Sequence, residues 1–276
     1  MPEGDTIYRS ARTLQRALGG KVVTGFRSML PRLTRVHEDT PITGRTIESV
    51  TANGKWMMIR FSGDLTLLTH MLMSGSWHIY KPGEKWFRKS YDMRIVIETA
   101  DYVAVGFMTP IAEFHTEKSL AERKGFKSLG QDVLGKEFDE AEALAALRSR
   151  PELEVGDALL NQSLMAGVGN VFKSEVCFAC AIHPFKSIYS VSTEDAAKLV
   201  STSRKFLLAN VTDKSGDQIV TYTGHRRTTG RMRPEERLWV YGRDGMPCRK
   251  CGTIIEKRKQ GVDARITFWC PMCQKL

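Results

Sequence analysis

The first residues of the chain, Pro2 and Glu3, place a potential nucleophile beside a carboxyl group. Met1 precedes the small residue Pro2, so we expect its removal, which leaves Pro2 with a free secondary amine. An α-amino group has an ordinary pKa of about 8 and is a usable nucleophile at neutral pH. Such an amine attacks an aldehyde-like carbon to form an iminium, and a carboxyl group transfers protons. The pair predicts covalent chemistry at the amino terminus, and the alternative is an ordinary frayed end.

Four cysteines near the other end of the chain have the spacing of a zinc ribbon. They form two Cys-x-x-Cys pairs separated by eighteen residues: Cys248 and Cys251, then Cys270 and Cys273. Four thiolates close the coordination shell, which predicts a structural Zn²⁺ rather than a catalytic one. Metal binding would also supply folding free energy that so short a segment lacks. The cations between the pairs, Arg265 among them, favour contact with nucleic acid, and the alternative is a ribbon that binds proteins.

Two turns place a polar side chain at the start of a predicted element. Residues 165–170 contain two glycines and precede a helical run from 171 to 180, with Asn170 as the expected helix cap. Exposed amides at such a helix start bind anions, although a purely structural turn is the alternative. Residues 53–55 form a second turn, which projects Lys55 at the start of a strand. A lysine there is either functional or simply solvated.

A third turn follows an apolar run and contains His70 and Met73 within residues 70–75. On strand alternation Met71 and Met73 share a face with Leu67, which predicts core packing. The alternative is an apolar wedge pushed into a base stack.

Three further features have a structural interpretation. Residues 86–89 pair two aromatic side chains with two cations, and a loop with snorkelling side chains is an equal alternative. Cys177 and Cys180 lie inside an apolar helical run with no second cysteine pair nearby, so we expect buried thiols. The polar stretch from Val211 to Arg237 is rich in Thr, Gly and Arg and is expected to be a mobile loop.

The composition fits a folded protein that binds a polyanion. The 276 residues suggest about two domains. Lys and Arg outnumber Asp and Glu by 41 to 31, although this charge does not choose among DNA, RNA and anionic lipid. No stretch has the length and apolarity of a membrane span or a signal peptide. We therefore expect an intracellular protein without membrane association, cytoplasmic and close to the nucleoid.

Short apolar runs and helical periodicities alternate along the chain in two regions. A helix is expected from Thr6 to Leu18, ended by two glycines. Short strands, typical of a sandwich or barrel, are then expected at residues 22–26, 46–50, 56–61, 65–73, 93–97 and 102–107. Helices are expected at residues 138–148, 155–164, 171–180 and 193–209.

Six motifs in order give the chain a resemblance that spans Met1 to Lys275. They are the start Met-Pro-Glu-Gly-Asp-Thr, Asn-Gly-Lys at 53–55, His-Met-Leu-Met-Ser-Gly at 70–75, the stretch at 159–175, Val-Tyr-Gly-Arg-Asp-Gly at 240–245, and the cysteine ribbon. The chain resembles the formamidopyrimidine-DNA glycosylase and endonuclease VIII family of base-excision repair enzymes. Its opening residues look closer to the endonuclease VIII branch.

The resemblance implies a role for each candidate residue. Pro2 would attack C1′ of a damaged nucleotide, Glu3 would act as acid and base, and β and δ eliminations would nick the DNA. Lys55 and Arg265 would complete the catalytic set by holding phosphates near the lesion. The DNA-binding set is Asn170 on a phosphate, His70 within the Met73 motif, Met73 in the space of the extruded base, and Glu175, which either supports the active site or is structural. The cysteine ribbon would hold one Zn²⁺.

Three departures limit the transfer. No match exists in residues 107–113 for the arginine loop of the 8-oxoguanine branch, so the wedge is incomplete. The family's acidic residue is replaced by Thr6, and an arginine frequent in the family is replaced by Asn53. These changes put lesion choice and opposite-base discrimination in doubt.

The resemblance implies a multidomain α+β fold with an N-terminal β-sandwich catalytic domain at residues 1–130. A helical domain with the helix-two-turn-helix and the mobile loop would occupy 131–237, and the zinc ribbon 238–276. The expected partner of this monomer is damaged double-stranded DNA, with single-stranded or bubble DNA left open, and the expected lesions are oxidised pyrimidines. The alternatives are a non-catalytic damage-binding protein on the same scaffold and a ribbon that recruits proteins.

Overall fold

The computed structural model describes residues 2–211 and 237–276, which divide into two compact units. The first unit consists of residues 2–128, and the second consists of residues 129–211 and 237–276. The predicted loop from Val211 to Arg237 lies almost wholly outside the described residues. None of the described helices is long and apolar enough to cross a membrane.

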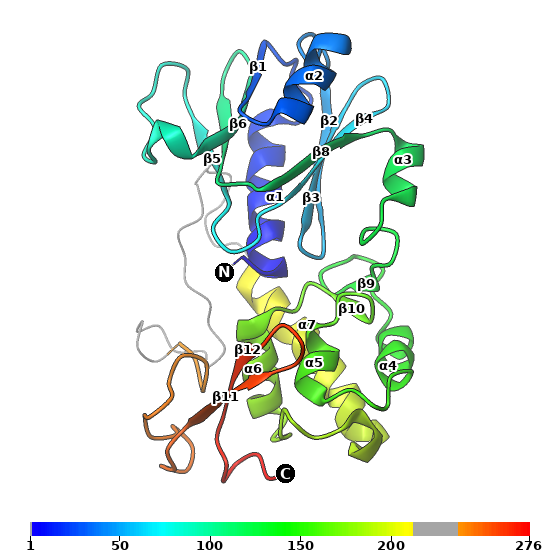
Figure 1. Ribbon diagram of the computed structural model, residues 1–276, viewed down its shortest axis with the longest axis vertical. Coiled ribbons are helices and arrows are strands. Elements are labelled where there is room, and N and C mark those ends of the chain that lie inside the picture. Colours follow the sequence, from blue (N-terminus) through cyan, green and yellow to red (C-terminus); the bar gives the residue numbers. More distant parts are fainter. Residues whose placement is uncertain (1, 212–236) are drawn as a thin grey trace. The chain divides into compact units, whose positions relative to one another are not determined.

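The first unit contains two four-stranded antiparallel sheets with three α-helices (Figure 1). Its elements are α1 (Gly4–Leu18), β1 (Gly25–Ser28), α2 (Pro31–Asp39), β2 (Ile47–Asn53), β3 (Trp56–Phe61), β4 (Leu65–His70), β5 (Ser76–Tyr80), the 3-10 helix η1 (Ser90–Asp92), β6 (Met93–Glu98), β7 (Val103–Phe107), β8 (Ile111–His115) and α3 (Glu117–Glu122). The strand orders are β1-β6-β7-β5 and β2-β3-β4-β8. Buried side chains of both sheets and of α1 form one apolar core, so the predicted sandwich is confirmed.

The predicted strands are most accurate in the middle of the sheets. β3 is buried at every position except Arg60, and β4 at every position except His70, so both read as continuous apolar runs. The edge strands β5 and β8 were not predicted. Each carries polar side chains on its exposed face, as Glu113 and His115 show for β8, and this breaks up the apolar pattern.

Helix α1 buries the face that its periodicity predicts. Ile7, Ala11, Leu14 and Leu18 are all at most 2% exposed. The helix ends at Leu18, and Gly20 follows in the left-handed region with φ of 76°. Its start differs from the prediction, because α1 begins at Gly4 rather than at Thr6.

The second unit combines helices with a carboxy-terminal hairpin. Its elements are β9 (Gln131–Asp132), α4 (Glu140–Arg148), α5 (Val155–Leu160), β10 (Met165–Ala166), α6 (Asn170–Ala179), η2 (Ile188–Ser190), α7 (Thr193–Val211), β11 (Glu256–Gln260) and β12 (Arg265–Trp269). Helix α6 packs against α5, α7 and β12. The helix predicted to extend to Leu164 ends at Leu160, because the Asn161 side chain accepts hydrogen bonds from the Ser163 amide and hydroxyl and forms a turn.

The thiols of Cys177 and Cys180 are free and buried in α6 and at its end, as predicted. Burial raises the pKa of Cys177 to about 12, so the thiol stays protonated at neutral pH. Cys177 therefore packs as a small apolar group, whereas the Cys180 thiol donates to the Lys198 carbonyl at 3.5 Å.

Candidate active site and metal centre

Glu3 is the N-cap residue of α1, directly before its first residue Gly4. Its backbone carbonyl accepts the amides of Thr6 and Ile7 at 2.9 and 3.1 Å, which explains why the helix starts earlier than predicted. Glu3 is fully buried, and Pro2 is half-buried beside it. A carboxyl group at a helix start is favoured by the helix dipole. The position of Glu3 argues against a frayed terminus, because α1 holds the residue in place.

A buried ion pair lies within the first two turns of the same helix. Asp5 is fully buried, and its carboxylate pairs with the Arg9 guanidinium at 3.1 Å. The Thr6 hydroxyl donates to the other carboxylate oxygen of Asp5 at 3.3 Å. Thr6 stands where the family has an acidic residue, and the residue directly before it, Asp5, carries a buried carboxylate. The i, i+4 spacing of Asp5 and Arg9 was a sequence signal that could have revealed this pair.

Lys55 lies just before β3 and His70 ends β4, and these two strands are neighbours in one sheet. Lys55 lies in the two-residue turn between β2 and β3, and His70 ends β4 opposite Trp56. The rings of His70 and Trp56 meet edge to face, with centroids 4.7 Å apart. The His70 Nδ1 atom accepts the Leu72 amide at 3.1 Å, so a neutral His70 carries its proton on Nε2.

Electrostatics keep His70 neutral at physiological pH. Burial, together with the positive charges of Lys55 and Arg123, lowers the pKa of His70 to about 4. The imidazole therefore offers a neutral Nε2–H donor next to the cation of Lys55.

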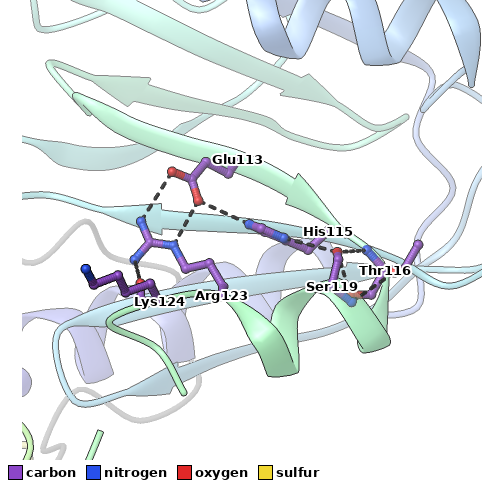
Figure 2. A network of polar contacts seen from close by, with 6 residues as sticks. All are labelled: Glu113, His115, Thr116, Ser119, Arg123 and Lys124. Atoms are coloured by element: carbon purple, nitrogen blue, oxygen red, sulfur yellow. Dashed lines mark hydrogen bonds and ion pairs between the residues drawn. The ribbon is translucent and has the colours of Figure 1, made fainter. Parts of the chain in front are cut away.

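Arg123 reaches this region through a network that the sequence did not reveal (Figure 2). Its guanidinium lies over the Trp56 ring at 4.2 Å and forks onto the Glu113 carboxylate at 2.9 and 3.2 Å. His115 contacts the same carboxylate at 3.1 Å and is joined to Ser119 of α3 at 3.2 Å. The hydrogen bonds from Arg123 hold the pKa of Glu113 below its ordinary value. The network fixes Arg123 next to the residues of the Lys55 turn.

Met71 and Met73 have opposite environments, because β4 ends at His70 and a turn follows. Met71 is 1% exposed and belongs to the core, whereas Met73 is 60% exposed. The turn is tight: the Gly75 amide donates to the Met71 carbonyl at 2.8 Å, and a Cβ at Gly75 would lie 2.6 Å from that oxygen. Core packing of Met73 is therefore wrong, and its exposure agrees with the wedge alternative.

Asn170 contacts β12 within the second unit, at the residue that follows Arg265. Asn170 is the first residue of α6, and Gly169 rather than Asn170 occupies the cap position. The Asn170 side-chain amide donates instead to the Ile266 carbonyl at 2.9 Å, next to the exposed Arg265 on β12. The expected cap is wrong because the side chain bonds to the ribbon.

Glu175 and Lys173 are charged side chains buried inside the second unit, and both are fully buried. The Glu175 carboxylate accepts the backbone amides of residues 239, 240 and 241 at 2.8 to 2.9 Å. The Lys173 ammonium donates to the hydroxyl of Thr267 on β12. Both side chains tie α6 to the carboxy-terminal segment. The sequence prediction missed the burial of Lys173, which lies next to two apolar residues, Val171 and Phe172.

The four ribbon cysteines form one cluster. Their Sγ atoms all lie within 4.8 Å of one another, with 3.9 Å between Cys248 and Cys273 and 3.5 Å between Cys251 and Cys270. A tetrahedral zinc site with bonds of about 2.3 Å places its sulfurs about 3.8 Å apart. The Lys250 amide points at the Cys248 sulfur at 3.4 Å, as in a metal-binding knuckle. The donor set and spacing fit one metal ion.

Comparisons with known proteins agree with this architecture. Residues 1–110 match the Formamidopyrimidine-DNA glycosylase N-terminal domain, and residues 129–221 match the Formamidopyrimidine-DNA glycosylase H2TH domain. The chain is 39% identical to a probable endonuclease 8 2 of Streptomyces coelicolor, over 99% of this chain and 94% of that protein. The chain belongs to the formamidopyrimidine-DNA glycosylase and endonuclease VIII family.

Other relatives support the branch and the fold of this family member. It is 35% identical to the DNA-(apurinic or apyrimidinic site) lyase Nei2 of Mycolicibacterium smegmatis, over 99% of both chains. Relatives named endonuclease 8 or Nei2 are more similar than those named formamidopyrimidine-DNA glycosylase, which are 28% identical, so the expected branch is confirmed. The structure of Lactococcus lactis Fpg bound to DNA with an abasic site shares the fold, with a TM-score of 0.80, 23% identity and full coverage of both chains.

Proposed function

We propose that this family member is a DNA glycosylase and abasic-site lyase that removes oxidised bases from double-stranded DNA, with pyrimidines preferred. Its relatives carry the names endonuclease 8 and DNA-(apurinic or apyrimidinic site) lyase. The observation that carries the proposal is the position of Pro2, directly before a fully buried Glu3 at the start of α1. A rigid helix thereby presents an amine and a carboxyl group as one unit.

The proposed chemistry begins when the Pro2 nitrogen, after removal of Met1, attacks C1′ of the damaged nucleotide. The C1′–N bond to the base breaks, the base leaves with a proton, and the sugar ring opens to an iminium. Glu3 moves protons on the sugar during this step. The iminium makes the C2′ proton acidic, so eliminations expel the 3′ phosphate and then the 5′ phosphate. Water then releases the sugar fragment from Pro2.

DNA binding is assigned to residues of both units. In the first unit the Lys55 cation and the His70 Nε2–H donor would share a phosphate, and the exposed Met73 would fill the space of the extruded base. In the second unit Arg265 and the start of α6 at Asn170 would bind another phosphate. Glu175 would act indirectly, because its carboxylate holds the backbone of residues 239–241 in place. The net charge of +10 predicts binding that weakens steeply with salt.

One Zn²⁺ is assigned to the four-cysteine cluster of the ribbon. When bound, the ion would fix the two knuckles at the base of the β11–β12 hairpin, which carries Arg265. A four-thiolate site has no open position for a substrate. The metal would therefore hold the DNA-binding hairpin and take no part in bond breaking.

Borohydride trapping tests the proposal. The protein is incubated with a duplex that contains one abasic site, and the covalent adduct is compared with that of Pro2→Gly after the amino terminus of each has been verified by mass. We expect an adduct that Pro2→Gly fails to form efficiently. Duplexes with thymine glycol and with 8-oxoguanine then compare the two lesion classes. No adduct from processed, zinc-loaded protein would favour the alternative, a damage-binding protein without turnover.

A further inference from the structure

The segment between β5 and β6 exposes two aromatic side chains that the proposed function does not use. Phe87 is 90% exposed and Tyr91 is 70% exposed, only four positions apart. Exposing a large apolar ring is unfavourable. Both rings stand on one short loop, residues 81–92, where a ligand could contact them.

Contacts with buried aromatic residues hold the backbone of this loop in place at Phe87. Trp86, the residue before it, packs edge to face on Phe107 with centroids 5.7 Å apart and lies 6.4 Å from the Tyr80 ring. The Phe87 amide donates to the Tyr80 hydroxyl at 3.2 Å. Tyr80 and Phe107 are themselves buried. The backbone is thus fixed at Phe87, while its side chain points away from this small core.

The second half of the loop is tied to the same sheet. The Met108 amide, just after β7, donates to the Asp92 carbonyl at 2.8 Å. The Arg94 guanidinium donates to the Tyr91 carbonyl at 3.0 Å. Because both exposed aromatics stand on backbone with such anchors, ordering a ligand on them would cost little conformational entropy of the protein.

The charge around the rings is strongly positive. Residues 81–94 contain five cations and two carboxylates, a net charge of +3. The cations are Lys81, Lys85, Arg88, Lys89 and Arg94, and the carboxylates are Glu84 and Asp92. One of the two carboxylates, Glu84, accepts the Lys81 amide at 2.7 Å within the turn. Exposed rings interleaved with cations are the combination that binds unpaired nucleotides, with bases on the rings and phosphates on the cations.

We propose that loop 81–92 binds single-stranded DNA, with an unpaired base stacked on Phe87 and the adjoining phosphates on Lys85 and Lys89. Tyr91 offers a second ring, with the Lys89 ammonium 5.5 Å from its centroid. The inference rests on the proposed function only in taking DNA as the ligand. It makes lesions beside single-stranded segments, such as those in bubbles or at overhangs, the preferred substrates.

Fluorescence anisotropy with matched probes tests the loop. One probe is a blunt duplex with a tetrahydrofuran abasic analogue, and the others add ten deoxythymidines as a 3′ or a 5′ overhang. Stacking of one base predicts at least about fivefold tighter binding of one overhang probe by the wild type. Phe87→Ser should lose this gain and keep the blunt-duplex affinity. Tyr189→Ser is the matched control, because Tyr189 is 83% exposed but lies in the second unit.

A second variant tests the phosphate-binding cations. Lys85→Glu combined with Lys89→Glu should make overhang binding less sensitive to salt. The slope of the logarithm of the binding constant against the logarithm of the salt concentration should become less steep by roughly 0.7 for each phosphate that the variant no longer neutralises. An equal overhang gain in Phe87→Ser and wild type would overturn the proposal, as would no gain in the wild type. Equal losses of Phe87→Ser on blunt and overhang probes would also overturn it. Borohydride trapping on the blunt duplex reports on Pro2 separately, so the two proposals fail independently.

Discussion

The side-chain amide of Asn170 donates a hydrogen bond to the backbone carbonyl of Ile266, with 2.9 Å between the two atoms. This bond joins the start of α6 to β12 at the residue after Arg265. We therefore expect the loss of the Asn170 side chain to alter the position of Arg265. We expect Asn170→Ala and Arg265→Ala each to weaken binding of an abasic duplex by roughly 1–2 kcal/mol. The double variant should lose clearly less than the sum, because under the proposed function the two residues bind the same phosphate.

Equilibrium binding at one fixed salt concentration measures this cycle. Lys55→Ala combined with Arg265→Ala is the control, since Lys55 belongs to the other unit and its effect should add to that of Arg265. Strict additivity of Asn170→Ala and Arg265→Ala would mean that the Ile266 bond does not couple them.

The His70 pKa predicts how stability depends on pH. Burial, with Lys55 and Arg123, lowers the pKa of His70 from 6.5 to about 4 in the folded protein. Between these values the unfolded chain binds more protons, so this contribution is fully present above pH 6.5 and is lost as the pH falls toward 4. Urea unfolding at pH 7 and pH 5 should show a smaller loss of stability for His70→Gln than for the wild type. Equal losses would show that His70 is not held neutral.

Arg123 is expected to act on His70 through its charge. Arg123→Gln removes a cation that lowers the pKa of His70, so NMR titration of the His70 ring should show a higher pKa in this variant. Glu113→Gln is the matched comparison, because it removes the fork partner of Arg123 but keeps the Arg123 charge. We expect the His70 pKa to rise in Arg123→Gln and to stay the same or fall in Glu113→Gln, because Glu113→Gln removes a negative charge and leaves the Arg123 cation in place. The opposite order would assign the effect to the geometry of the network.

Zinc removal should unfold the cysteine ribbon of the second unit. Metal analysis is expected to find one zinc per chain, and a chelator should unfold the ribbon and abolish duplex binding, because metal binding is coupled to folding. Cys251→Ala should lose the metal. Cys180→Ala, a buried thiol outside the four-cysteine cluster, should keep it. Full duplex affinity after complete removal of zinc would rule out the proposed role of the hairpin.

The sequence predicted elements whose signal is local and missed contacts between distant segments. The buried stripe of α1 and the cysteine cluster each follow from residue spacing alone. Edge strand β8 was missed because only one of its faces packs on the core. The fork between Arg123 and Glu113 joins a strand to the loop after α3, and no spacing rule connects them. Asn170 was taken for a cap because its actual partner, Ile266, lies 96 positions away.

Lys173 provides a final test of how α6 is joined to the ribbon. Its ammonium, fully buried, donates to the Thr267 hydroxyl, which in turn donates to the Gln260 amide oxygen at 2.7 Å. The Gln260 side-chain amide then donates to the Glu154 carboxylate at 2.8 Å. Thr267→Val takes an acceptor from a buried charge, which should destabilise the protein by roughly 3 kcal/mol.

Lys173→Met removes the charge itself, so adding Thr267→Val to it should cost much less than Thr267→Val alone. Denaturant unfolding of the wild type, the two single variants and the double variant measures the coupling. Ser203→Ala is the control, because its buried hydroxyl bonds within α7, to the Leu199 carbonyl, and its effect should add to that of Lys173→Met. A coupling between Lys173 and Thr267 no larger than that of this control would show that the buried bond contributes nothing specific to the joint between α6 and β12.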